Sequence, residues 1–290
     1  MLLDDQQDPG VVAPELTEKQ REEAEDRTSV SVDVVHEAIR HDGEEELKRP
    51  ISALAWSGFA AGLSMGFSFV GQALLYAHLP DTPWRPLLTN LGYPLGFLIV
   101  IIGRQQLFTE NTLTAMIPLL ARRNWFTLLR VARLWAVVLA ANLVRAHLFA
   151  WVVGNTPMFK PDVQAAMLAL AKHAADVTFG AAVLRGIFAG WLIAMVVWML
   201  AAVDTGRIAV IVILTYAVGV ANLTHIIAGA VEVLFLPMVG ARSWGSIAWT
   251  YLLPTLIGNI IGGTSLTAAV NHAQVVAGMN GRKKRRLLSE

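Results

Sequence analysis

The feature that most constrains this chain is a series of apolar stretches, each long enough to cross a membrane. A helix needs about 20 apolar residues to span the hydrocarbon core. Because lipid satisfies no backbone polar group, such stretches form helices. They cover residues 51–77, 87–120, 126–153, 179–203, 208–236 and 247–270. We therefore predict an all-α membrane protein with six transmembrane helices.

Two of the stretches are interrupted by polar residues. The sequence Leu-Phe-Thr-Glu at 107–110 interrupts the second stretch, and Asn-Leu-Thr-His at 222–225 interrupts the fifth. Two halves of three helices that cross in opposite senses form an inverted repeat, and paired broken helices indicate a binding site near the bilayer midplane. The similarity between the two breaks pairs Thr109 with Thr224 and Glu110 with His225.

An ionisable residue inside a membrane is a functional-site hypothesis by default. His225 lies in the middle of an apolar run from Tyr216 to Glu232 that also contains Asn222 and two glycines. We expect His225 to lie on a substrate route through the bilayer. The alternative is a histidine that only joins neighbouring helices by hydrogen bonds.

The charges divide the chain into three parts. Fifteen of the 22 acidic residues fall within residues 1–48, which we predict to be an acidic cytoplasmic N-terminal tail with short amphipathic helices. Residues 49–276 form the predicted six-helix channel domain, and residues 277–290 form a basic cytoplasmic C-terminal tail. The basic run directly follows a span, so we expect it to anchor the chain to anionic lipid and not to bind nucleic acid.

The N-terminal tail allows two interpretations. Helical patterns occur near 16–27, where Thr17 and Gln20 fit a capping box, and near 32–40. The tail is either a partly disordered segment or an amphipathic element docked under the membrane body, with His36 and His41 as pH sensors.

Lysine and arginine counts predict the orientation. With the N-terminus inside, twelve of these residues lie near the inner membrane ends and four near the outer ends. This excess places both termini in the cytoplasm, which we expect to be that of a bacterium, so the protein spans the cytoplasmic (inner) membrane.

Three segments together resemble the formate/nitrite transporter family. They are Leu107-Phe108-Thr109, the Thr-His-Ile-Ile-Ala run at 224–228, and the Pro-Thr-Leu-Ile-Gly-Asn-Ile-Ile-Gly-Gly run at 254–263. With weaker similarity elsewhere, the resemblance covers residues 33–272. It implies an aquaporin-like fold, a homo-pentamer with one pore per subunit, and passage of small monovalent anions such as formate or nitrite.

The resemblance also implies roles for single residues. His225 would donate or share a proton between two apolar constrictions, and Thr109 would offer a hydroxyl across the pore. Candidates for the constriction walls are Leu107, Phe108 and Tyr216, although ordinary packing is the alternative for Phe108 and Tyr216.

Three positions depart from the family pattern. Gly190 replaces an asparagine of the fourth helix and so removes a polar contact near the expected histidine. Glu110 follows the Leu-Phe-Thr element, where it would repel anions unless it pairs with Arg104 or hydrogen-bonds His225. Lys172 stands near, but not at, the position of the family's basic residue that attracts anions at the pore mouth.

The sequence also argues against several functions. It contains no cysteine, and its apolar body has no His-x-x-x-His pair and no clustered carboxylates, so we expect no metal, no cofactor and no enzymatic activity. A pore for water or neutral solutes is one alternative to an anion channel, although Asn-Pro-Ala motifs are absent. The other is a non-conducting membrane sensor or scaffold that binds partners through its tail.

Overall fold

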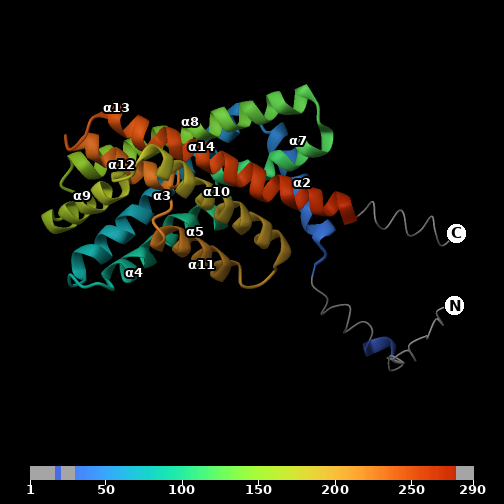
Figure 1. Cartoon of the computed structure of the whole chain (residues 1–290), viewed down its shortest axis with the longest axis horizontal. Coiled ribbons are helices and arrows are strands. Elements are labelled where there is room, and N and C mark those ends of the chain that lie inside the picture. Colours follow the sequence, from blue (N-terminus) through green and yellow to red (C-terminus); the bar gives the residue numbers. More distant parts are fainter. Residues whose placement is uncertain (1–16, 21–29, 279–290) are drawn as a thin grey trace, which may run out of the picture.

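The computed structural model describes residues 17–20 and 30–278, whose regular secondary structure is entirely helical. Figure 1 shows a bundle with α2 (Val32–Lys48) at one end and α9 (Pro161–Ala175) at the other. Between these ends run the long helices α3 (Ile51–His78), α8 (Trp125–Asn155) and α10 (Phe179–Ala202). The other helices are α4 (Arg85–Thr89), η1 (Asn90–Gly92), α5 (Pro94–Ile102), α6 (Phe108–Thr114), α7 (Met116–Arg122), α11 (Arg207–Val220), α12 (Ala228–Met238), α13 (Trp244–Ile247), η2 (Ala248–Leu252), α14 (Leu253–Ile261) and η3 (Gly262–Ala269).

The structure confirms an all-helical chain with apolar spans, whereas the count of six transmembrane helices stays a prediction. Within the described residues, five helical stretches are long and apolar enough to cross a membrane: Ile51–His78, Arg85–Ile102, Trp125–Asn155, Phe179–Ala202 and Trp244–Gly278. The predicted stretch 208–236 consists of two shorter apolar helices, α11 and α12.

Both predicted helix breaks are present. The first separates α5 from α6, and the second separates α11 from α12. Just after α5 and α11 the backbone becomes left-handed, with φ near 50° at Arg104 and at Asn222. A left-handed residue after the last helical turn is a common way to end a helix.

Two buried asparagines satisfy the backbone groups that the breaks expose. Asn142 on α8 accepts a hydrogen bond from the Phe108 N–H at 3.0 Å. Its Nδ2 donates to the carbonyls of Gly58 at 2.7 Å and Gln106 at 3.0 Å. One side chain thus ties the first break to both α3 and α8.

Asn259 on α14 makes the corresponding contacts at the second break. Its Oδ1 accepts from the Ile226 N–H at 2.8 Å. Its Nδ2 donates to the carbonyls of Gly186 at 2.8 Å and Thr224 at 3.0 Å. The two halves of the chain are therefore related by matched side-chain contacts.

These contacts correct the alignment that the sequence predicted. They make Leu107 equivalent to His225, whereas we had paired Thr109 with Thr224 and Glu110 with His225. The four-residue similarity was misleading because the register of each break is set by an asparagine on another helix.

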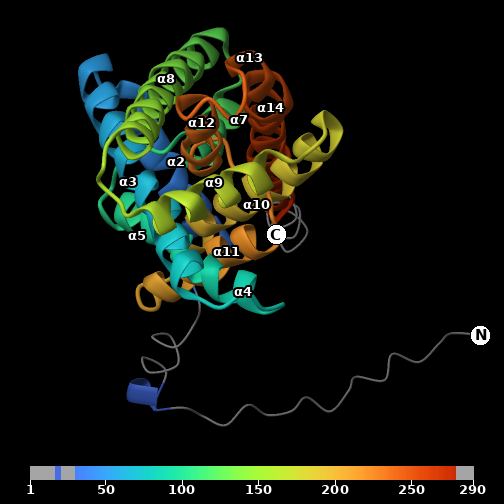
Figure 2. The same ribbon diagram turned by 90° about the vertical axis from the view of Figure 1, so that its left-hand side faces the viewer.

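Helix α9 was not predicted. At 15 residues it is too short to span a membrane, and polar residues stand on both sides of its apolar centre at 165–171. It buries Val163, Met167 and Ala171 against α3 and α12, and Figure 2 shows it lying across this end of the bundle.

The N-terminal helix is longer than predicted and is docked. Instead of ending near residue 40, α2 continues to Lys48 and buries Val35, Ile39 and Leu47. Gly43 permits a close approach, since a Cβ there would lie 2.0 Å from the Thr114 carbonyl oxygen. For residues 32–48 the structure therefore supports the docked element over the disordered tail.

The more N-terminal helix candidate lies largely outside the described residues. Within it, Thr17 and Gln20 form the expected capping box: the Thr17 N–H donates to Gln20 Oε1 at 3.0 Å, and the Gln20 N–H donates to Thr17 Oγ1 at 3.4 Å.

We predict that the two asparagines are essential for folding. Asn142→Ala or Asn259→Ala leaves two buried backbone groups of the break without partners, one N–H and one carbonyl, each costing about 1–3 kcal/mol. Thermal unfolding in detergent should show a much lower midpoint for both variants. Asn155→Ala is the matched control, because Asn155 is exposed at the end of α8. Equal midpoints for all three variants would contradict this role.

Docking of α2 should depend on pH through His36. Its Nε2 lies 3.0 Å from Nδ1 of His272 near the end of the last helix. Burial, and secondarily His272, lower the pKa of His36 from its ordinary value of 6.5. The undocked helix therefore binds a proton more readily, so docking is fully stable above about pH 6.5 and weakens as the pH falls.

Hydrogen exchange of α2 measures this effect. We expect less protection at about pH 5.5 than at about pH 7.5, and a smaller difference in His36→Gln. His41→Gln changes an exposed histidine on the same helix and should retain the full pH response. If the pH dependence of exchange is lost in His41→Gln and kept in His36→Gln, His36 is not the titrating group.

Candidate functional site

Each helix break opens onto a cavity, and the two cavities lie at opposite ends of the bundle. The α9-side cavity has a volume of about 410 Å³ and is lined by Asn222, Leu223 and Thr224 of the second break. The α2-side cavity, of about 400 Å³, is lined by residues 104–106 of the first break. The pseudo-equivalent segments thus face opposite ends.

An apolar barrier separates the two cavities. It contains Leu107 and Phe108 from the first break and Phe97 from α5, each at most 1% exposed. None of the three lines either cavity. All three belong to one buried hydrophobic cluster, and the role of Leu107 and Phe108 as constriction walls stays a prediction.

Within this barrier His225 meets Thr109. Both side chains are fully buried, and His225 Nε2 lies 2.9 Å from Thr109 Oγ1. The edge of the Phe97 ring packs against the imidazole, with the centroids 5.1 Å apart. Among the described residues, this hydrogen bond joins the side chains that follow the two breaks, and both residues were predicted from the sequence.

The hydrogen bonds of His225 define its tautomer. Nδ1 accepts from the backbone N–H groups of Ile227 at 3.2 Å and Ala228 at 3.0 Å, so it carries no proton. Nε2 therefore carries the proton and donates it to Thr109 Oγ1. The Thr109 hydroxyl hydrogen is left to donate to whatever enters the barrier.

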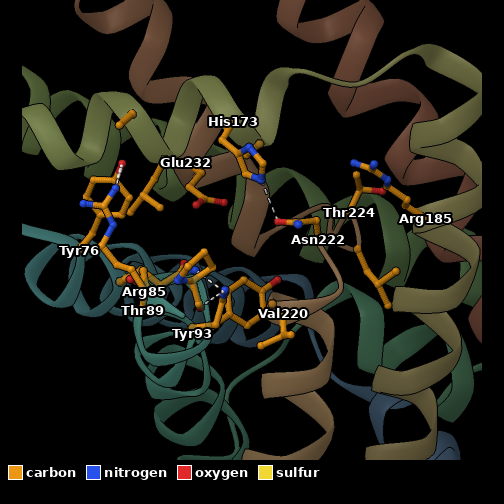
Figure 3. A pocket seen from close by; sticks show the side chains of 18 of the residues that line it. Tyr76, Arg85, Thr89, Tyr93, His173, Arg185, Val220, Asn222, Thr224 and Glu232 are labelled. Atoms are coloured by element: carbon orange, nitrogen blue, oxygen red, sulfur yellow. Dashed lines mark hydrogen bonds between the residues drawn. The ribbon is translucent and has the colours of Figure 1, made fainter. Parts of the chain in front are cut away.

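The α9-side cavity contains both basic and acidic groups (Figure 3). Arg85 is held by the Tyr76 hydroxyl at 2.8 Å and by Asp81 at 2.9 Å. His173 Nε2 lies 3.2 Å from Asn222 Oδ1. Arg185 also lines the cavity, as does the buried Glu232, shown beside His173 in Figure 3.

The α2-side cavity is predominantly acidic. Five carboxylates line it against two guanidinium groups, Arg104 and Arg207. The carboxylates are Asp42, Glu45, Glu46, Glu110 and Asp204. Three of the five belong to α2, where Glu45 pairs with Lys48 and Glu46 pairs with Arg49.

Glu110 makes neither of the two contacts that the sequence suggested, an ion pair with Arg104 or a hydrogen bond to His225. It lines the α2-side cavity, where its Oε1 is buried without a hydrogen-bond partner. It forms no ion pair with Arg104 among the described contacts, and Nε2 of His225 bonds Thr109 instead. Glu110 is thus a feature of the cavity and not a partner of the histidine.

Several other predicted site residues lie elsewhere. Tyr216 lines neither cavity, and its hydroxyl donates to the Leu87 carbonyl at 3.0 Å. Lys172 is exposed, and its neighbour His173 enters the cavity in its place. Thr224 lines the α9-side cavity while its hydroxyl donates to the Ala182 carbonyl at 2.8 Å.

Gly190 is a packing residue. A Cβ at this position would lie 2.4 Å from the Asn259 carbonyl oxygen, so no larger residue fits between α10 and α14. The expectation that Gly190 leaves a polar contact missing beside His225 is therefore wrong, because α14 fills this space.

Sequence reasoning missed Arg185 and Tyr251 as cavity residues. Arg185 lies within the predicted span 179–203, and a charge at such a position is a signal for a cavity. Tyr251 lies at the cavity wall and is 3% exposed. No group of three or more possible metal ligands occurs among the described residues.

The family model for formate/nitrite transporters matches residues 33–273. The chain belongs to the formate/nitrite transporter family. Inner membrane protein YfdC of Escherichia coli (strain K12) is 40% identical over 260 residues, which cover 90% of this chain and 84% of that protein. Formate channel BtFdhC of Bacillus thuringiensis is 24% identical over 235 residues, covering 79% of this chain and 89% of the relative.

Solved structures agree with this membership. A pentameric formate channel with formate bound aligns with a TM-score of 0.64 at 22% identity, covering 74% of this chain and 94% of that one. A second, an FNT family ion channel, aligns with a TM-score of 0.67 at 17% identity, covering 81% and 96%. The chain is thus a multi-pass membrane protein of a transport family with the predicted aquaporin-like fold.

Cysteine labelling tests the two cavities, because this family member contains no native cysteine. Gln105→Cys should react with a membrane-impermeant thiol reagent only from the α2 side, and Leu223→Cys only from the opposite side. Leu107→Cys, in the barrier, should stay unreactive. The extent of labelling is measured in right-side-out and in inside-out membrane vesicles. Labelling of Gln105→Cys and Leu223→Cys from the same side would contradict the two-cavity arrangement.

Proposed function

We propose that the chain is a channel or transporter for small monovalent anions of the formate and nitrite type, linked to proton movement. Its relatives include a formate channel from Bacillus thuringiensis, and a solved structure of the same fold is a pentameric formate channel with formate bound. By the same reasoning we propose a homo-pentamer with one pore per subunit, in a bacterial inner membrane with both termini cytoplasmic.

The Thr109–His225 pair carries this proposal. An anion that leaves either cavity enters a wall of apolar side chains, where an unpaired charge is costly. The Thr109 hydroxyl is a hydrogen-bond donor within these apolar side chains, and the hydrogen bond from His225 fixes the orientation of that hydroxyl. In addition, the N-terminus of α12 carries a partial positive charge beside His225, which favours an anion there.

The same geometry limits what His225 does with protons. A second proton on the ring would have to occupy Nδ1, and this atom already accepts two backbone hydrogen bonds. Positive charge beside the N-terminus of α12 is also unfavourable. His225 therefore acts as a neutral hydrogen-bond donor, and a substrate crosses most readily as its neutral acid.

A pore for neutral solutes is the second candidate function. The predominantly acidic α2-side cavity favours it, because a small anion is repelled there and a neutral molecule is not. Flux of a neutral solute that exceeds flux of every anion tested would support this alternative. No flux of either kind would favour the sensor or scaffold.

Thr109→Val tests the anion pathway with little change in shape. The variant loses the pore hydroxyl and leaves the buried Nε2–H of His225 unpaired, at about 1–3 kcal/mol, so formate flux into proteoliposomes should fall roughly tenfold or more. Thr109→Ser should retain most of the flux.

Thr215→Val is the matched control. Thr215 is also fully buried, but its hydroxyl donates to the Ile211 carbonyl of its own helix, at 2.7 Å. Unchanged flux in Thr109→Val, in protein of normal oligomeric size, would remove the pair from the pathway.

A further inference from the structure

Glu232 is a buried carboxyl with no role in the scheme above. It lies in the second turn of α12, is 9% exposed, and lines the α9-side cavity. No hydrogen bond or ion pair to it is formed by the described residues. Figure 3 shows its carboxyl group within the cavity, between His173 and the arginine on α4. A buried carboxyl group without a partner either binds a ligand or carries a proton, because its unpaired charge would be costly.

The other titratable groups of the cavity are already engaged or lie apart. Asp81 pairs with Arg85, which also bonds Tyr76. His173 faces Asn222. Figure 3 shows Arg185 on the far side of Asn222 from Glu232. Tyr93 and Tyr251 are the remaining titratable residues that line the cavity.

Tyr251 connects Glu232 with the barrier. Tyr251 and Glu232 line the same cavity, and the Tyr251 hydroxyl packs against Gly229 of α12, near the start of the helix that carries Glu232. This position depends on Gly229, because a Cβ there would lie 1.9 Å from the Tyr251 hydroxyl oxygen. The carboxyl group thus stands at the end of the cavity that adjoins the Thr109–His225 pair.

We propose that Glu232 is the proton donor to the anion in the α9-side cavity, an inference that rests on the proposed function. A carboxyl group buried without a partner holds its proton, because the charged form has lost its water. The O–H bond of Glu232 breaks as an O–H bond forms on the substrate carboxylate. The neutral acid then enters the barrier, and Glu232 regains a proton from water in the cavity.

The remaining groups of the cavity suit this step. Arg185 has no ion pair among the described residues and attracts the anion to the cavity, whereas Arg85 is already paired with Asp81. His225 cannot supply this proton, since its Nε2–H is committed to Thr109 and its Nδ1 to two backbone groups. Donation therefore falls to the carboxyl group in the cavity.

Glu232→Gln tests the proposal, because it keeps the size of the side chain and removes its acidic proton. The assay follows labelled formate and internal pH together in proteoliposomes. We expect proton-linked formate uptake near neutral pH to fall roughly tenfold or more, the scale of a lost proton donor. At low external pH, where formic acid itself is more abundant, the uptake should approach that of the native protein.

Two further variants complete the experiment. Glu37→Gln, a control at an exposed ion pair on α2, should behave as the native chain does. Glu232→Asp keeps a carboxyl group and should retain the entry of one proton with each formate ion, also where the glutamine variant fails to assemble. An aspartate variant that carries formate without protons would overturn the proposal.

Formate uptake by the native protein distinguishes a failure of the Glu232 proposal from a failure of the proposed function. If it carries formate with protons and Glu232→Gln has the same rate at every pH, Glu232 is not the donor and the proposed function stands. If assembled native protein carries no formate at any pH, the proposed function itself fails.

Discussion

The structure depends on how the backbone is satisfied where two helices break inside a membrane. Free N–H and carbonyl groups at that depth cannot be left to lipid. Asn142 and Asn259 meet this requirement, each with one side chain that bonds the break and a neighbouring helix. Because each asparagine fixes the chain on both sides of its contact, it also determines which residues of the break face a cavity and which face the barrier.

This arrangement makes the barrier short. Residues 104–106 and 222–224 line cavities at opposite ends, and the next residue of each break, Leu107 or His225, is fully buried. A solute therefore loses its water only over the short stretch between these positions. The Thr109–His225 contact lies in this stretch, so a single hydroxyl can influence the whole barrier.

The sequence predicted the helices better than their contacts. Long apolar stretches and the two polar interruptions were sufficient for the spans and the breaks, since hydropathy and backbone satisfaction are local requirements. The register between the breaks was predicted wrongly, because it depends on asparagines far away in the chain. For the same reason Gly190 was assigned to a missing polar contact, although α14 lies against it. The role of Tyr216 as a constriction wall stays a prediction. Helix α9 was missed because its short, mixed pattern is stabilised by α3 and α12.

The two cavities differ in charge, and this difference bears on direction. In the proposed function, an anion is attracted to the α9-side cavity, which Arg85 and Arg185 line, and there a carboxyl group converts it to the neutral acid. On the other side, an acid that releases its proton becomes an anion among five acidic side chains, of which the buried Glu110 holds its proton, and two guanidinium groups. Repulsion there favours its departure into solution over its return to the barrier. Most of these carboxylates come from α2, whose docking involves the His36–His272 contact, so the position of one helix outside the membrane sets the electrostatics of the exit.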